Sequence, residues 1–205
     1  MPSNLAVLTP SRRSEAPSRS ASSLSSTTDA FRAFLESLGL DLSDPNLAGT
    51  DRRVARAYRE MLRGLRSAPP RLSTFPNTNR YSDLVAVGDI PFYSICAHHF
   101  LPFFGTARIA YVPKDRLVGL SKLTRAVDHF ARRPQLQEDL TEQVASLLEE
   151  KLAPAGLIVS IEARHLCMEM RGVSRSGLLT RTTAVRGALA DQRLQKRFFD
   201  GGGRS

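Results

Sequence analysis

The chain has 205 residues, 41% of them hydrophobic, which suits one compact domain with extensions. No apolar run approaches the roughly 20 residues that span a membrane, and the N-terminus lacks the apolar segment of a secretory signal. The two cysteines are too few for a disulfide scaffold. A soluble protein of a reducing cytoplasm is therefore expected. The net charge of +9 favours an anionic partner, and because no nucleic-acid-binding motif is present, a phosphorylated small molecule is expected rather than nucleic acid.

The first third of the chain is predicted to be a polar tail followed by two helices. Residues 1–29 are rich in Ser, Arg and Pro, which is typical of a disordered tail. Residues 30–70 are predicted to form a helical arm, because apolar residues recur at helical spacing in "DAFRAFLESLGL", which Asp29 could cap, and in "TDRRVARAYREMLRGL". Arg53 and Arg56 are neighbours on the polar face of the second helix. Three prolines in residues 66–80 indicate a loop.

Residues 81–190 show the order strand pair, helix pair, strand pair. The first strands are "SDLVAVGDIPFYSIC" and "GTARIAYVP", and the last are "GLIVSIEARHLCMEM" and its hairpin partner "LLTRTTAVRGAL". Between them lie the helices "SKLTRAVDHFARR", which Ser121 is placed to cap, and "QLQEDLTEQVASLLEEKL". This order predicts an α+β layer, in which helices cover one face of an antiparallel sheet. Residues 191–205 are interpreted as a C-terminal tail.

The cysteines and histidines are concentrated in two short segments. Cys96, His98 and His99 lie within four residues in "FYSICAHHFLPFFG", whereas His165 and Cys167 lie in "IEARHLCME". Residues two apart on a strand face the same side, so His165 and Cys167 are expected on one face. The remaining histidine, His129, is interpreted as an ordinary surface residue of the middle helix.

These side chains indicate a zinc site with two cysteines and one histidine. Thiolate and imidazole are ligands that zinc favours, and three protein ligands leave a position where water can be activated. The alternatives are a Cys96–Cys167 disulfide, which a reducing compartment disfavours, or two buried thiols beside packed histidines. Spacing does not decide between His98 and His99: Cys96 and His98 share a face of an ideal strand, while His99 needs a turn or bulge.

Two further elements point to phosphate. Ser121, Lys122 and Arg125 lie at the predicted start of a helix, where free backbone N–H groups favour anions. Arg171 lies just beyond the second cysteine. Each feature alone is typical of a solvated surface, but beside a metal site they indicate a phosphorylated substrate.

Four separated motifs resemble the GTP cyclohydrolase I family: "FYSICAHHFLPFFG", "GLSKLTRAV", "RRPQLQEDLTEQVA" and "ARHLCMEMRGV". They occur in the family's order, and the resemblance runs from about Phe31 through Gly187. It implies the tunnelling fold, a four-stranded antiparallel sheet with two helices on one face, preceded by an N-terminal helical arm. It also implies a homodecamer with active sites between subunits.

The resemblance also implies a role for each matching residue. Cys96, His99 and Cys167 would bind Zn²⁺, and His98 and His165 would be catalytic. Glu138 would anchor guanine, with Gln137 beside it. The positions that match the binding sites of the ribose and the triphosphate are Ser121, Lys122, Arg125, Arg171, Arg53 and Arg56, the last two reaching in from a neighbouring subunit.

The implied reaction is hydrolysis of GTP to 7,8-dihydroneopterin triphosphate and formate, the first step of tetrahydrofolate and pterin biosynthesis. His165 would donate a proton to the purine N7, and His98 would act as acid and base in sugar opening. One alternative is a paralogue with this chemistry in a deazapurine or specialised pterin pathway. The other is a catalytically inactive pterin- or purine-binding regulator, which the complete set of matching residues disfavours.

Four positions depart from the family pattern. Ala97 stands where the family usually has Glu between the zinc cysteine and the first histidine, and this change could alter the surroundings of the metal. Asp51 replaces a common Pro in the helical arm. Arg181 and Arg186 stand where small or apolar residues are commoner, which is expected to affect subunit packing.

Overall fold

The computed structural model describes residues 23–172 and 174–200 as a mixed α+β protein. The chain divides into an N-terminal unit, which ends at Ala57, and a C-terminal unit, which starts at Tyr58. The predicted tail falls largely outside the described residues. In the part that is described, no helix has the length and apolar character to cross a membrane.

The N-terminal unit contains helix α1 (Leu24–Ser37) and the first part of helix α2 (Thr50–Met61). Helix α1 starts before Asp29 because the Ser23 side chain caps it by accepting a hydrogen bond from the backbone N–H of Ser26 (3.1 Å). The prediction that Asp29 caps this helix was therefore wrong, and residues 24–29 are helical. Asp51 is buried, and Arg32 pairs with its carboxylate at 2.7 Å.

A five-stranded sheet in the order β5-β2-β3-β6-β7 forms the centre of the C-terminal unit. The four long strands pair antiparallel with their neighbours, as predicted; they are β2 (Val85–Cys96), β3 (Pro102–Val112), β6 (Gly156–His165) and β7 (Thr180–Gly187). The sheet has five strands rather than four, because the two-residue β5 (Pro134–Gln135) pairs parallel with the end of β2.

A separate two-stranded sheet joins β1 (Thr74–Pro76) to β4 (Arg116–Val118). The β1 segment was predicted to be part of a loop. Arg116 explains part of the pairing, because its Nε donates to Thr74 Oγ1 at 2.6 Å. In chain order, the 3-10 turn η1 (Arg63–Leu65) lies between α2 and β1.

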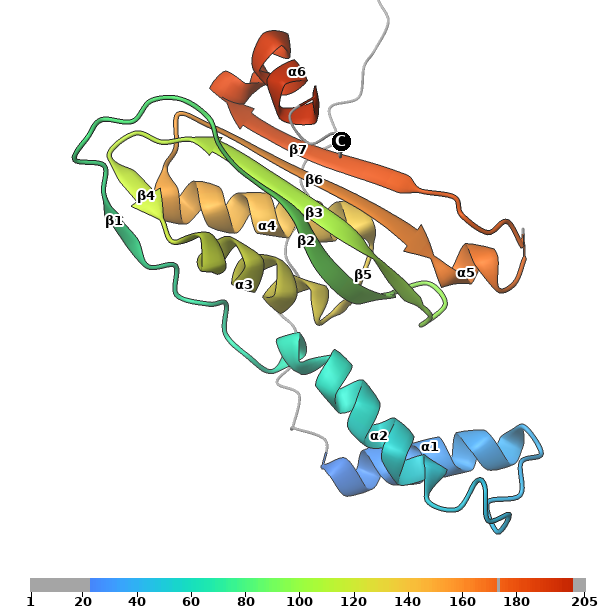
Figure 1. Cartoon of the computed structure of the whole chain (residues 1–205). Coiled ribbons are helices and arrows are strands. Elements are labelled where there is room, and N and C mark those ends of the chain that lie inside the picture. Colours follow the sequence, from blue (N-terminus) through green and yellow to red (C-terminus); the bar gives the residue numbers. More distant parts are fainter. Residues whose placement is uncertain (1–22, 173, 201–205) are drawn as a thin grey trace, which may run out of the picture. The chain divides into compact units, whose positions relative to one another are not determined.

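Helices α3 (Leu120–Ala131) and α4 (Gln137–Leu152) cover one face of the five-stranded sheet (Figure 1). Their apolar stripes pack on alternate side chains of the strands, which is the reason for the periodicity in the sequence. Fully buried members of this core include Leu123, Leu140, Phe103, Ile109 and Ile161. Ser121 does not cap α3: the N-cap residue is Gly119, and no side chain bonds there.

The other face of the sheet is partly covered by helix α6 (Gln192–Asp200), which follows the 3-10 turn η2 (Ala188–Ala190) (Figure 1). Phe198 of α6 is 3% exposed and packs with Ala110, Ile158 and Leu189. Arg108 lies 5.1 Å from the Phe198 ring and donates to its carbonyl oxygen at 3.0 Å. The prediction of helices on one face only was therefore wrong, as was that of a tail over residues 192–200.

His129 is buried within α3, which contradicts its interpretation as a surface residue. Its Nε2 lies 2.7 Å from an Arg133 guanidinium nitrogen, and its Nδ1 lies 3.4 Å from Ser67 Oγ. Because a guanidinium only donates, Nε2 must be the accepting nitrogen. Burial and the neighbouring Arg133 lower the pKa of His129, while Asp128 opposes them. A neutral histidine therefore belongs to the packing of this helix.

Candidate active site

The turn after β2 brings the first cysteine and one histidine together. Cys96 is the last residue of β2 and is 5% exposed. Its carbonyl oxygen accepts from the N–H of Phe100 at 3.0 Å, and its N–H donates to the carbonyl of Leu101 at 2.9 Å. Phe100 has a φ of 58°, so the chain reverses sharply here. This is the turn that His99 needs if it is to reach the side of Cys96.

The second cysteine comes from a short helix rather than a strand. Strand β6 ends at His165, and α5 (Leu166–Glu169) follows at once. The prediction that His165 and Cys167 share one face of a strand was therefore wrong. Cys167 instead approaches the turn after β2 from the first turn of α5.

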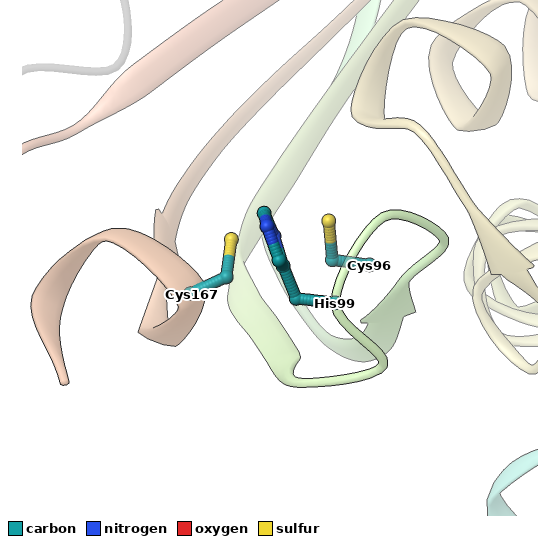
Figure 2. A group of neighbouring side chains, drawn as sticks. All are labelled: Cys96, His99 and Cys167. Carbon is teal, nitrogen blue, oxygen red and sulfur yellow. The ribbon is translucent and has the colours of Figure 1, made fainter. Parts of the chain in front are cut away.

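Cys96, His99 and Cys167 form a cluster that could hold a metal ion. Their ligand atoms all lie within 4.8 Å of one another, and both cysteines are free thiols. Figure 2 shows the three side chains pointing into the same space from the turn after β2 and from α5. His98 is exposed and does not belong to this cluster, although its ring lies 6.2 Å from that of His99. Two sulfurs and one imidazole nitrogen are a donor set that fits zinc.

The environment of Cys167 favours the neutral thiol when no metal is bound. Burial is the main cause that raises its pKa, and the neighbouring Cys96 adds to it, while Arg171 opposes both. A bound cation would reverse this balance, because coordination favours the thiolate.

His165 lies beside the cluster and is held by two neighbours. Its ring stacks parallel on Phe103, with centroids 4.8 Å apart, and its Nε2 lies 2.8 Å from Gln137 Oε1. Burial lowers the pKa of His165, and Glu138 partly offsets this. Gln137 itself is 2% exposed at the start of α4.

A pocket of about 320 Å³ joins these side chains. The residues of the predicted site that line it are Cys96, His98, His99, Gln137, Glu138, His165 and Cys167. The sequence analysis missed four others, which are Gln135, Leu136, Met168 and Thr180. Leu136 and Met168 adjoin predicted residues and could have been found from that, whereas Thr180 starts β7 and enters the pocket only through the pairing of β7 with β6.

The remaining predicted residues are not among those that line the pocket. Ser121, Lys122 and Arg125 lie in the first half of α3, which starts after β4 and ends before β5, the strand that pairs with Cys96. They are thus toward the opposite end of the sheet (Figure 1). Arg171 is exposed just after α5. Arg53 and Arg56 are exposed on α2 in the N-terminal unit, where Arg53 donates to Ala48 O and Thr50 Oγ1.

Comparison with known proteins gives one consistent result. The sequence model of a family described as GTP cyclohydrolase I matches residues 27–202. A GTP cyclohydrolase 1 of Streptococcus agalactiae serotype V is 49% identical over 168 residues, covering 82% of this chain and 90% of that protein. A GTP cyclohydrolase 1 of Carboxydothermus hydrogenoformans is 49% identical over 162 residues, covering 78% of this chain and 84% of that protein.

Among solved structures, an archaeosine synthase QueF-Like in the apo form aligns with 17% identity and a TM-score of 0.42. The alignment covers 51% of this chain and 94% of that one. A likeness at this level carries no conclusion about the site.

Proposed function

This chain belongs to the GTP cyclohydrolase I family and is an enzyme of that class, and we propose that it converts GTP to 7,8-dihydroneopterin triphosphate and formate with a zinc ion. The observation that carries this proposal is the cluster of Cys96, His99 and Cys167 in one pocket with Glu138 and His165. We place the reaction in the cytoplasm, at the first step of tetrahydrofolate biosynthesis.

The metal would be held by Cys96, His99 and Cys167. Three protein ligands leave one position of a tetrahedral zinc site open. The chemistry that zinc supplies in such a site is the activation of water near neutral pH, here for hydrolysis at the purine C8. All three side chains line the pocket, so a metal that they held would be within reach of a substrate bound there.

Glu138 would select guanine. Its exposed side chain lies in the first turn of α4 and lines the pocket. A carboxylate accepts two hydrogen bonds, and guanine offers N1–H and the 2-amino group side by side. Adenine lacks this pair of donors, so the carboxylate would discriminate against it.

His165 and His98 would move protons at two different places. Both line the pocket, and neither belongs to the metal cluster. His165, next to the cluster, would protonate N7 as the imidazole ring of the purine opens. His98 would act as acid and base when the ribose ring opens, before rearrangement and closure to the pterin.

The triphosphate would be bound by cations of more than one subunit. Within one chain, Lys122 and Arg125 lie toward the end of the sheet away from the pocket, and Arg171 lies near Cys167. A second copy that places the start of its α3 against this pocket would supply the missing cations, with Ser121 near the ribose. Arg53 and Arg56 of another subunit would complete the set. This arrangement requires active sites between subunits, and the resemblance to the family implies that the assembly is a homodecamer.

The proposal is tested by incubating purified, zinc-replete protein with GTP and measuring formate and the fluorescent oxidised neopterin. We expect equimolar products from GTP and none from ATP. Absence of turnover in protein with one zinc per chain would contradict the proposal. The mass in solution tests the decamer separately.

A further inference from the structure

We propose that Gln137 is a positioning residue that fixes which ring nitrogen of His165 carries the proton. This inference rests on the proposed function only in giving His165 a proton to transfer. It assigns Gln137 a role different from the substrate binding that is expected from its place beside Glu138.

The orientation of the Gln137 amide is determined by its surroundings. Its Nε2 lies 3.0 Å from the carbonyl oxygen of Ile161, 3.0 Å from that of Thr180 and 3.1 Å from Thr182 Oγ1. Backbone carbonyls only accept hydrogen bonds, so the nitrogen of the amide must face them. A flipped amide would place its oxygen against two carbonyl oxygens in a buried site, which is strongly unfavourable.

The hydroxyl groups of two threonines reinforce this orientation. Thr182 Oγ1 accepts from Gln137 Nε2, so its own proton is directed to Thr141 Oγ1 at 2.6 Å. Thr141 Oγ1 in turn donates to the carbonyl oxygen of Gln137 at 2.9 Å. The chain of hydrogen bonds thus begins and ends on Gln137, and it ties the start of α4 to β7. Rotation of the amide would break it.

With the nitrogen fixed, Gln137 Oε1 faces His165. An amide oxygen only accepts, so the 2.8 Å contact requires a proton on His165 Nε2. In the neutral imidazole, Nδ1 then carries the lone pair, so under the proposed function it would first accept a proton, from the water that attacks C8, and then deliver that proton to N7. No hydrogen bond from any residue that the structure describes occupies His165 Nδ1, so this nitrogen is the one left for the substrate. The parallel stack on Phe103 fixes the plane of the ring at the same time.

Both polar groups of the Gln137 side chain are therefore engaged within the chain. The residue is 2% exposed, and its neighbour Glu138 is the exposed carboxylate of the pair. This division explains why two polar residues stand side by side at the start of α4: Glu138 faces the substrate, and Gln137 holds His165.

The spectroscopic test uses zinc-loaded protein labelled with ¹⁵N-histidine, since the chain has only 4 histidines. The ¹⁵N shifts distinguish the two neutral tautomers, and the spectrum of His165→Ala identifies the His165 signals. We expect His165 of the unaltered protein to carry its proton on Nε2. In Gln137→Met, which keeps a similar volume without the amide, we expect the two tautomers to be mixed. An Nδ1–H tautomer in the unaltered protein, or no change in Gln137→Met, would overturn the proposal.

The kinetic test separates positioning from substrate binding. We expect Gln137→Met to lower kcat about 10- to 100-fold, less than the roughly 10²- to 10⁴-fold that a general acid or base itself contributes, while KM for GTP and the zinc content stay nearly unchanged. Thr182→Val, which removes one acceptor of the amide and leaves two, should show a smaller loss of kcat. A raised KM with unchanged kcat would instead make Gln137 a guanine-binding residue and overturn the proposal.

The two proposals fail in different ways. If the unaltered protein does not turn over GTP, the proposed function fails, but the tautomer of His165 can still be read. If Gln137→Met does not fold, the tautomer in the unaltered protein and in Thr182→Val still decides the matter.

Discussion

The two ends of the sheet in the C-terminal unit differ in what they offer a substrate. At one end, β2, β6, α4 and α5 converge on a pocket that holds the candidate metal-binding cluster, two further histidines and Glu138. Toward the other end, the first half of α3 carries Ser121, Lys122 and Arg125 outside that pocket. A helix of 12 residues is about 18 Å long. Under the proposed function, one chain thus carries the place for the base and the metal, but keeps these phosphate-binding candidates apart from it.

The largest effect is expected at the metal end. Cys167→Ala removes one of two thiolates, so we expect the protein to lose stoichiometric zinc and all detectable formate release together. Elemental analysis and the GTP assay measure the two losses, and Lys122→Ala, at the other end of the sheet, serves as the control that keeps its zinc. Zinc retained by an inactive Cys167→Ala protein would show that this cluster is not the metal site.

His165→Ala should separate chemistry from metal binding. The side chain lies beside the cluster but outside it, so we expect zinc to stay bound while kcat falls by roughly 10²- to 10⁴-fold, the contribution of a general acid or base. The measurement is kcat alongside zinc per chain. Loss of zinc from this variant would mean that the three ligands have been misassigned.

Arg125→Ala tests whether the first half of α3, at the end of the sheet away from the pocket, binds the triphosphate. It should raise KM for GTP roughly 10- to 100-fold through loss of a charge-assisted hydrogen bond. The sharper measurement mixes unfolded Arg125→Ala and Cys167→Ala chains and refolds them together. If each site combines the pocket of one subunit with α3 of another, some interfaces in the mixed assembly pair two intact halves, and activity at low GTP exceeds that of either parent. Refolded parents that gain nothing on mixing would place both halves in one chain.

The smallest effect concerns the helix that lies between the two ends. The pKa of buried His129 is lowered in the folded state, mainly by burial, so the unfolded chain binds more protons below its pKa of about 6.5. The free energy of unfolding should therefore fall as the pH decreases through that value. Urea unfolding at about pH 7.5 and about pH 5.5 measures it. His129→Gln can still accept a hydrogen bond from Arg133, and its free energy of unfolding should fall less between these two pH values. An equal fall would exclude His129 as the cause.

The long elements were predictable from sequence because their apolar periodicity reflects the core directly. Strands β2, β3, β6 and β7 and helices α3 and α4 all follow from it. The ends of elements and the short elements were not predictable: Ser23 and Asp29 are equally good capping residues, and "LCME" reads as a continued strand although it forms α5. Such choices depend on tertiary contacts that no local pattern contains.

The site was predictable in its composition and not in its geometry. Clustering of Cys96, His98, His99, His165 and Cys167 is visible in the sequence, but the turn that separates His98 from His99 is not. The buried position of Gln137 depends on carbonyls of β6 and β7, which are distant in sequence. The hydrogen bonds that orient the His165 side chain are thus the part that only the folded chain shows.

Helix α6 bears on how this protein should be handled at the bench. Because Phe198 fills the apolar surface formed by Ala110, Ile158 and Leu189, a chain cut before Gln192 would expose that surface to water. Contiguous exposed apolar surface promotes aggregation. An affinity tag that displaces this helix would cause the same loss of solubility, so any attachment at this end should leave residues 192–200 intact and be joined beyond them.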